Sequence, residues 1–183
     1  TPTALGTQTA TITINNNDCD EAVYNFAVTG KGATPAAALN FDGTDDFVSV
    51  PDAGSLDLGT SVTLEAWVKP ESFAGYNMII DKRDLADVSA NYGLTLTNGK
   101  PMFYFWNGGN VSFHIATNAI ALNAFTHLAA TYDGAMVRIF VNGTQVYAQA
   151  ETDVPPSNNQ PLSIGRNQVA LQYFDGDIDE VRI

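Results

Sequence analysis

Three aspartates spaced two residues apart stand near the end of the sequence and could bind a metal ion. Asp175, Asp177 and Asp179 lead into a short apolar segment with the composition of a strand. Residues two apart on a strand point to the same side, so the three carboxylates would crowd like charges onto one face. A cation would offset that repulsion, and converging oxygen ligands suit Ca²⁺. The spacing therefore predicts a calcium site, with solvated turn aspartates as the alternative.

The alternation of the same segment breaks near its end. Ile178 and Val181 both have the character of core residues but lie three apart, so a regular strand cannot bury both. A β-bulge near Asp179 and Glu180 would reconcile them, and it would turn a backbone carbonyl aside together with a carboxylate. We therefore predict a bulged closing strand that contributes Asp179 to the metal site.

A second oxygen-rich turn lies near residue 42. Asp42-Gly43 is a hairpin signal, and the flanking apolar residues predict two short paired strands on either side of it. If the first and last strands of this domain pair, then Asp42, Asp46 and Asp179 could share one cation that joins its ends.

The composition limits the classes of partner. The chain has 183 residues, of which 45% are hydrophobic, so it can bury the core of one main domain with residues left over. Its net charge of −12 argues against nucleic acid, anionic membranes and acidic polymers, and favours neutral ligands or ions. The sequence contains no run of 18 apolar residues, so we expect no membrane insertion. The single cysteine, Cys19, excludes an intrachain disulfide.

Localisation is predicted from composition and from the first residues. Abundant Thr, Asn, Gly and Asp with few Lys are typical of an extracellular bacterial protein, secreted or on the cell surface. Thr1 opens no signal-peptide pattern, so we expect a mature or excised fragment of a longer protein.

The elements that must position these residues are strands. From residue 36 onward, short strands alternate with turns about every 8 to 12 residues and no amphipathic helix is evident, which is typical of an all-β sandwich. The predicted strands cover residues 61–69, 76–82, 92–97, 102–106, 111–115, 125–132, 136–141, 144–147, 161–165 and the closing segment.

The first part of the chain predicts a β-hairpin. Residues 9–14 and 24–30 alternate as strands around an Asn- and Asp-rich turn. A lone hairpin is marginal in water, so it either packs on the next domain or belongs to a sandwich upstream. These segments resemble the last two strands of bacterial immunoglobulin-like repeats called choice-of-anchor domains. The resemblance implies that residues 1–33 are the terminal hairpin of such a repeat plus a linker.

Several phrases of the main domain occur together in the order found in one family. They are Leu39–Val48, Leu64–Pro70, His127–Gly134, Val141–Gly143, Ser163–Arg166 and Phe174–Ile183. Over residues 36–183 the chain resembles the laminin G-like domains of the concanavalin A-like lectin and glucanase superfamily. The resemblance implies a two-sheet antiparallel jelly-roll sandwich, commonly with one structural Ca²⁺. Its ligand positions correspond here to Asp42, Gly43, Asp46 and Asp179.

Members of this family are mostly non-catalytic modules, and we expect the same of this chain. Asp175, Asp177 and Glu180 do have the spacing of the catalytic strand in glucanases of the superfamily. Retaining glycosidases, however, need two carboxyl groups held about 5 to 5.5 Å apart. The first and last members of the glucanase motif are glutamates, whereas position 175 is a shorter aspartate, so we expect no catalysis.

An aromatic strand gives the strongest signal for a ligand. Met102, Tyr104 and Trp106 point to one face, and Phe103 and Phe105 point to the other. Both faces therefore need cover, and a sugar ring could supply it by stacking its C–H face on an aromatic plane. A shift of one residue in register would exchange the two sets, and both sets could instead fill the core.

We predict a polysaccharide site on the outer face or loops around this strand. His114 alternates with apolar neighbours and should lie opposite the buried face, where its imidazole can hydrogen-bond a ligand. The predicted ligand-binding residues are Phe103, Phe105, Trp106, Asn107, His114, Tyr76, Arg83 and Tyr92. The alternative is a protein-binding adhesion module on a long surface protein.

Overall fold

The computed structural model describes residues 6–15, 23–32, 38–83, 90–107, 110–168 and 172–183. The chain divides into two units, Thr1–Ala37 and Ala38–Ile183. In the first unit, β1 (Gly6–Asn15) and β2 (Val23–Gly32) form the predicted antiparallel hairpin. Cys19 and the turn around it lie outside the described residues.

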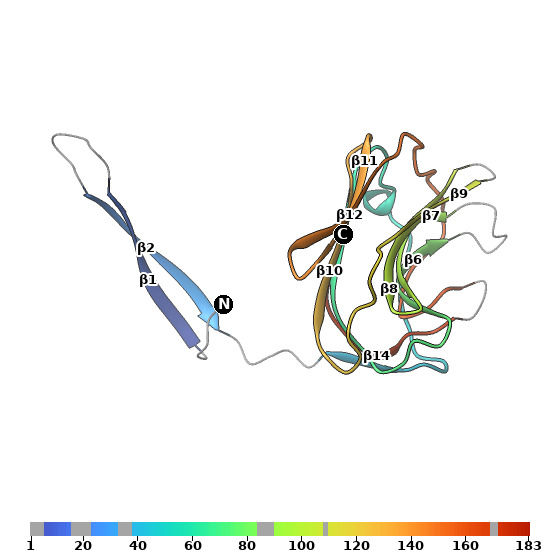
Figure 1. The fold of residues 1–183 in the computed structure, drawn as a ribbon, viewed down its shortest axis with the longest axis horizontal. Coiled ribbons are helices and arrows are strands. Elements are labelled where there is room, and N and C mark those ends of the chain that lie inside the picture. The colour runs from blue at the N-terminus through green and yellow to red at the C-terminus, as the bar shows by residue number, and fades with distance from the viewer. Residues whose placement is uncertain (1–5, 16–22, 33–37, 84–89, 108–109, 169–171) are drawn as a thin grey trace. The chain divides into compact units, whose positions relative to one another are not determined.

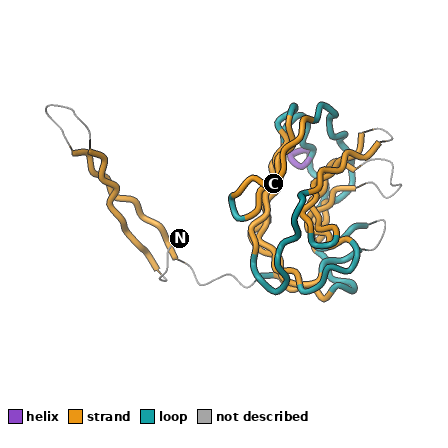
Figure 2. Tube along the Cα trace, in the orientation of Figure 1, coloured by secondary structure: helices purple, strands orange, loops and turns teal. Residues whose placement is uncertain are grey.

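The second unit is a sandwich of two antiparallel sheets, as predicted (Figure 1). Sheet I has the order β12-β11-β10-β5-β14-β3, and sheet II has the order β4-β13-β6-β7-β8-β9. Among the described residues the one helix is η1 (Gly54–Leu56), and none is long and apolar enough to cross a membrane (Figure 2). The strands are β3 (Leu39–Asp42), β4 (Val48–Val50), β5 (Val62–Pro70), β6 (Tyr76–Arg83), β7 (Ala90–Thr97), β8 (Lys100–Asn107), β9 (Asn110–Ile115), β10 (Thr126–Tyr132), β11 (Met136–Val141), β12 (Thr144–Ala150), β13 (Leu162–Ile164) and β14 (Asp175–Arg182).

The main core lies between the two sheets. In β5 every second residue is buried, so that Val62, Leu64, Ala66 and Val68 point inward while the residues between them face outward. This period of two is what a half-buried strand requires, because successive side chains point to opposite faces of a sheet. The same rule gives sheet II an inner face and an outer face.

The closing strand contains the predicted bulge. The register of β14 against β5 shifts between Asp179 and Arg182, and Glu180 has a φ of +50°. Ile178 is buried and Val181 packs against the core, so the bulge brings both to the same side.

The pairing of the first strands differs in part from the prediction. The first and last strands of the sandwich do meet, because β3 pairs with β14 in register from Asp42↔Asp175 to Leu39↔Ile178. The predicted hairpin between β3 and β4 is wrong, since β4 pairs with β13 in the other sheet. The Asp42-Gly43 turn therefore begins the crossing from sheet I to sheet II.

Candidate functional site

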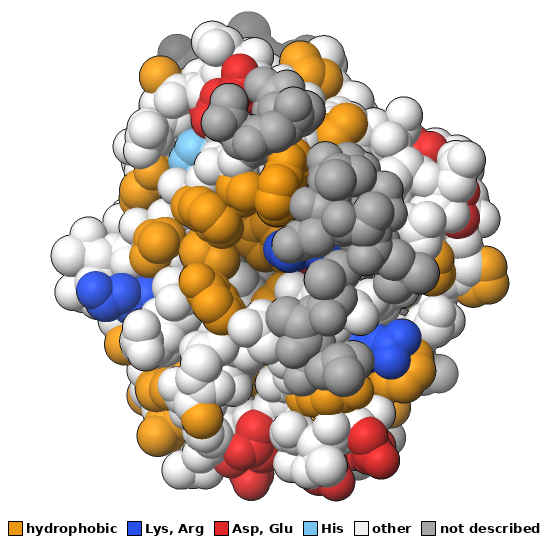
Figure 3. Space-filling view, turned by 90° about the vertical axis from the view of Figure 1, so that its right-hand side faces the viewer, with side chains coloured by type: hydrophobic (Ala, Val, Ile, Leu, Met, Phe, Trp, Pro, Cys, Tyr) orange, Lys and Arg blue, Asp and Glu red, His pale blue; other side chains and the backbone are white. Residues whose placement is uncertain are grey.

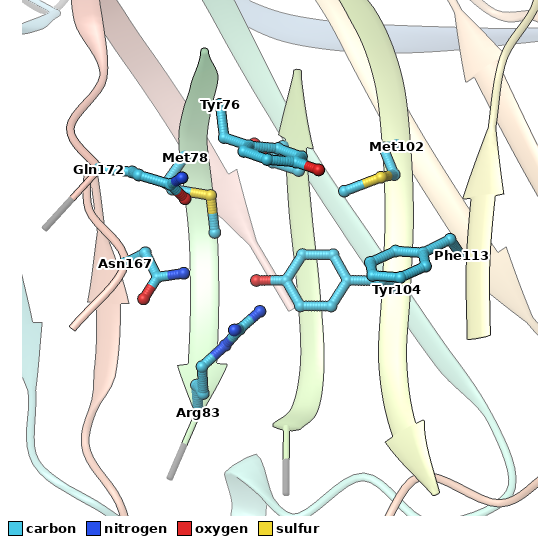
Figure 4. A pocket seen from close by; sticks show the side chains of 9 residues that line it. Tyr76, Met78, Arg83, Met102, Tyr104, Phe113, Asn167 and Gln172 are labelled. Atoms are coloured by element: carbon cyan, nitrogen blue, oxygen red, sulfur yellow. The ribbon is translucent and has the colours of Figure 1, made fainter. Parts of the chain in front are cut away.

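A pocket of about 190 Å³ lies on the outer face of sheet II, the face turned away from the main core. Hydrophobic side chains gather at the middle of this face (Figure 3). Met78, Met102 and Tyr104 form a buried cluster on this face that is separate from the core between the sheets. The pocket is lined by Tyr76, Met78, Arg83, Thr95, Met102, Tyr104, Phe113, Asn167 and Gln172 (Figure 4).

The floor of the pocket is built from one row of residues across four strands. Asp81, Gly93, Tyr104 and Phe113 are register partners on β6, β7, β8 and β9, so their side chains share a face. A Cβ atom on Gly93 would lie 2.2 Å from Cζ of Tyr104. The glycine therefore lets the tyrosine ring lie across β7, where its hydroxyl donates a hydrogen bond to Oδ1 of Asp81.

An ion pair adjoins this aromatic floor. Nε of Arg83 lies 3.6 Å from Oδ1 of the fully buried Asp81, and its guanidinium carbon lies 5.1 Å from the ring centre of Tyr104. Burial, and next the charge of Asp81, raises the pKa of Tyr104 well above its usual value, so its hydroxyl remains a donor. Because arginine and aspartate compensate each other, the floor presents no large net charge.

Two amide side chains lie on one side of the pocket, where Gln172 is beside Met78. Asn167 and Gln172 lie opposite Met102 and Phe113 (Figure 4). The backbone N–H of Asn167 donates to the carbonyl of Gln172 at 2.9 Å, which holds the two residues together in the connection between β13 and β14. Phe113 and Tyr76 are 52% and 39% exposed. Amide groups on one side and partly exposed rings on the other suit a ligand with one polar and one apolar surface.

Some of the predicted ligand-binding residues do come together here. Tyr76 and Arg83 line the pocket, and Trp106 packs against the methionine and tyrosine cluster on the same face. Asn107 ends β8, but its side chain lies outside the described part of the structure. Sequence reasoning missed Asn167 and Gln172, because they come from a connection without periodicity.

Phe103 and Phe105 do not lie on the outer face of sheet II, where the pocket is, and this corrects the prediction. Both are fully buried between the sheets, and the ring of Phe105 lies 5.5 Å from that of Tyr132 on sheet I. Tyr92 also points into the core, where its hydroxyl donates to the carbonyl of Leu56 at 3.0 Å. The alternation along β8 was predicted correctly, but both of its faces are aromatic, so the pattern could not say which one is inside.

His114 is also buried, contrary to the prediction. Its side chain points between the sheets, while its neighbours Phe113 and Ile115 are exposed. Nε2 of His114 lies 3.4 Å from Oε2 of Glu151, and Nδ1 lies 3.3 Å from the hydroxyl of Tyr147 on β12. The imidazole lies between the sheets because Tyr147 and Glu151, on the opposite side of the sandwich, give it polar partners. Both residues are far from His114 in sequence.

The stability of the sandwich is expected to fall as the pH drops through the ordinary titration range of histidine. Burial lowers the pKa of His114, and Glu151 opposes this shift in part. The unfolded chain therefore binds a proton at His114 at a higher pH than the folded chain does, so acid favours unfolding. Urea unfolding at pH 7.5 and pH 5 should show this loss, and His114→Gln should reduce it. If the free energy of unfolding of the variant fell between pH 7.5 and pH 5 by as much as that of the wild type, the loss would not come from His114.

The predicted calcium ligands do not fit one ion as a set. Asp42 lies opposite Asp175, which places Asp179 four positions further along β14, or about 13 Å away at ~3.3 Å per residue. Calcium ligands lie only about 2.3 to 2.6 Å from the ion. The carboxylate of Asp46 instead accepts a hydrogen bond from the backbone N–H of Asp42 at 3.2 Å, and Gly43 packs beside Asp175. In the described residues no three His, Cys, Asp or Glu side chains are placed to hold a metal.

A lysine offsets the charge of the central aspartate of β14. Oδ2 of Asp177 lies 2.9 Å from Nζ of Lys69, and its Oδ1 accepts a hydrogen bond from Asn40 at 2.9 Å. The hydrogen bond from Asn40, and then Lys69, lowers the pKa of Asp177. The repulsion expected along this strand is therefore reduced by neighbouring strands. Calcium binding by the chain stays a prediction, which melting curves with Ca²⁺ and with EDTA test.

Comparisons with known proteins agree on the fold. A laminin G-type family model, described as the concanavalin A-like lectin/glucanases superfamily, matches residues 42–183. A comparison with curated protein sequences returns no match.

Three solved structures are similar to the chain. Domains LG4-5 of the mouse laminin alpha1 chain are 14% identical with a TM-score of 0.65, covering 88% of this chain and 49% of that one. Domain 4 of AbnA, a GH43 extracellular arabinanase from Geobacillus stearothermophilus solved with arabinotriose, is 19% identical with a TM-score of 0.61. The match covers 95% of this chain and 80% of that one. The Ruminococcus gnavus IT-sialidase CBM40, bound to α2,3-sialyllactose, is 12% identical with a TM-score of 0.62. The match covers 78% of this chain and 88% of that one. The chain thus spans about half of the laminin structure.

Proposed function

Because the chain belongs to the concanavalin A-like lectin/glucanases superfamily, we propose that it is a non-catalytic carbohydrate-binding module. The observation that carries this proposal is the pocket on sheet II. Its aromatic floor and apolar side face Arg83, Asn167 and Gln172, which can hydrogen-bond a ligand. Sugars have apolar C–H surfaces and hydroxyl-bearing edges, and this division of the pocket complements them.

The charge of the chain supports a neutral polysaccharide as the ligand. The one arginine of the pocket is paired with Asp81, and the chain carries a net charge of −12. An acidic polymer would therefore meet long-range repulsion without a compensating cation in the pocket. Similar solved domains are described with arabinotriose and with sialyllactose, which supports a glycan ligand without identifying it.

The placement of the acidic motif supports a non-catalytic role. Asp175, Asp177 and Glu180 all belong to β14 in sheet I, whereas the pocket is on sheet II. Asp177 is paired with Lys69, and Glu180 is paired with Arg182. We infer that these carboxylates serve the packing of β14 with its neighbours.

The setting of the module is part of the proposal. We infer that it belongs to a larger secreted or cell-surface protein, in which the β1–β2 hairpin is the end of an immunoglobulin-like repeat. The hairpin leaves Ile12 and Val28 exposed at 42% and 38%, which supports a partner sheet that covers it.

Affinity electrophoresis through neutral and acidic polysaccharides tests the glycan proposal. We expect retention by a neutral polysaccharide, and we expect Phe113→Ala and Tyr76→Ala each to weaken binding about tenfold, which corresponds to about 1.4 kcal/mol. Phe125→Ala is the matched control, because Phe125 is 47% exposed but does not line the pocket. Equal retention of folded Phe113→Ala and wild-type protein would place the binding surface elsewhere.

The alternative function, protein adhesion, has support on the outer face of sheet I. Trp67 is 41% exposed there, and its ring lies 5.3 Å from that of His127. Exposed aromatic residues are enriched in protein interfaces. A protein ligand bound at this face would be lost with Trp67→Ala and kept with Phe113→Ala, the reverse of what the glycan proposal expects.

A further inference from the structure

We propose that Asp81 makes the pocket on sheet II select neutral sugars over acidic ones. The inference rests on the proposed glycan-binding function and adds the residue that determines specificity at that site. Asp81 is fully buried and is not one of the residues that line the pocket. It therefore acts through Arg83, as a positioning residue and as the counter-ion of the guanidinium, rather than by contact with the sugar.

Arg83 is the group that an acidic sugar would need. Among the described residues that line the pocket, it alone carries a charge at neutral pH. The segments of the second unit outside the described residues, 84–89, 108–109 and 169–171, contain no Lys or Arg. A guanidinium holds a carboxylate with two parallel hydrogen bonds, so an arginine without a counter-ion at this place would favour acidic sugars such as uronic acids.

The charge of Asp81 cancels this preference. Nε of Arg83 lies 3.6 Å from Oδ1 of Asp81, and the arginine side chain is only 13% exposed. Water screens charges weakly at such a buried place, so a carboxylate that approached the guanidinium would also be repelled by Asp81. A sugar hydroxyl accepts a hydrogen bond from Arg83 without this repulsion. The pair thus keeps a strong donor in the pocket but not its net charge.

Tyr104 holds the carboxylate of Asp81 in place. Its hydroxyl donates a hydrogen bond to the same oxygen, Oδ1, that faces Arg83, and its ring centre lies 5.1 Å from the guanidinium carbon. Asparagine has nearly the same shape as aspartate, and its amide oxygen can accept the hydrogen bond from Tyr104. Asp81→Asn therefore removes the charge of this residue and leaves the acceptor for Tyr104. The variant separates the charge of Asp81 from its place in the packing.

Affinity electrophoresis with matched neutral and acidic polysaccharides tests the inference. The probes are glucomannan, galactomannan, xyloglucan, mixed-linkage β-glucan and galactan, each also in a form whose C6 hydroxymethyl groups have been oxidised to carboxylates. At about 0.15 M salt, charges more than about 8 Å apart are largely screened. We expect the wild type to bind its preferred neutral polymer at least about tenfold more tightly than the oxidised form, because oxidation brings a like charge toward Asp81.

Asp81→Asn is expected to bind the oxidised form at least about tenfold more tightly than the wild type does. Asp133→Asn is the matched control, because it also removes one negative charge. It likewise deprives an arginine of its partner, since Asp133 lies 2.6 Å from Arg138, but it does so at the turn between β10 and β11 of sheet I. The control should keep the wild-type ratio between the two forms. A folded Asp81→Asn variant with the wild-type ratio would overturn the inference, as would a wild type that binds both forms equally.

A second variant serves if Asp81→Asn does not fold. Gln172→Arg adds a cation to the wall of the pocket and leaves the buried pair in place. It should also bind the oxidised form at least about tenfold more tightly than the wild type does, and continued rejection of that form would overturn the inference. Retention of the wild type that Phe113→Ala weakens would then keep the proposed function. No retention of the wild type by any polymer would overturn both.

Discussion

Replacing Lys82 by methionine is expected to lower the free energy of unfolding by about 3 to 5 kcal/mol. The lysine side chain is fully buried, and its Nζ lies 2.8 Å from Asp52 and 3.2 Å from Asp57. It also donates to the carbonyls of Asn158 at 2.7 Å and Gln160 at 3.1 Å. Methionine has a similar volume but no donor, so it would leave these acceptors without their shared partner. The lysine thus ties β6 to the segments before β5 and before β13.

Urea unfolding measures this effect, with Lys100→Met as the matched control. Lys100 is exposed at the turn between β7 and β8, so its loss should change the free energy of unfolding by less than about 0.5 kcal/mol. If Lys82→Met were destabilised by no more than the control, the buried ammonium would be no more favourable than an apolar side chain at this position.

Gly176→Ala is expected to destabilise the sandwich by about 3 kcal/mol or more. Gly176 has a φ of +128°, which side-chain-bearing residues rarely adopt. A Cβ atom there would lie 2.1 Å from the carbonyl oxygen of Lys69 and 3.0 Å from the backbone nitrogen of Glu71. Because these are backbone atoms, they cannot rotate away as a side chain could, so β14 would have to move away from β5.

Thermal and urea unfolding of this variant can be compared with Gly59→Ala. A Cβ atom on Gly59 meets nothing within 4 Å, and Gly59 has no positive φ, so its substitution should be nearly neutral. A melting temperature for Gly176→Ala within a degree or two of the control would show that β14 shifts without cost.

Local patterns were sufficient to predict much of the sandwich. The alternation of β5 predicted its inner face, and the three-residue spacing of Ile178 and Val181 predicted the bulge in β14. Both features depend on residues next to one another in sequence, where the period of a strand is directly visible. A cation shared by the oxygen-rich turns at the two ends of the domain required its first and last strands to pair, and β3 does pair with β14.

The site was harder to predict because its decisive contacts are distant in sequence. Tyr104 faces outward because Gly93 on β7 leaves room for its ring and because Asp81 on β6 accepts a hydrogen bond from its hydroxyl. His114 turns inward toward Glu151 on the opposite side of the sandwich. No pattern within a single strand contains this information, so the prediction exchanged the faces of β9 and left those of β8 unassigned.

The pairing of β3 with β14 has a consequence for the response of the module to tension. The start of β3 lies beside the middle of β14, since Leu39 pairs with Ile178, and β3 is an edge strand of sheet I that runs antiparallel to β14. A stretching force applied through both ends would therefore open this pair like a zipper, breaking its hydrogen bonds in succession rather than all at once. Such a geometry yields at low force. The pocket is built on sheet II, so the first strand to peel away is not one that carries it.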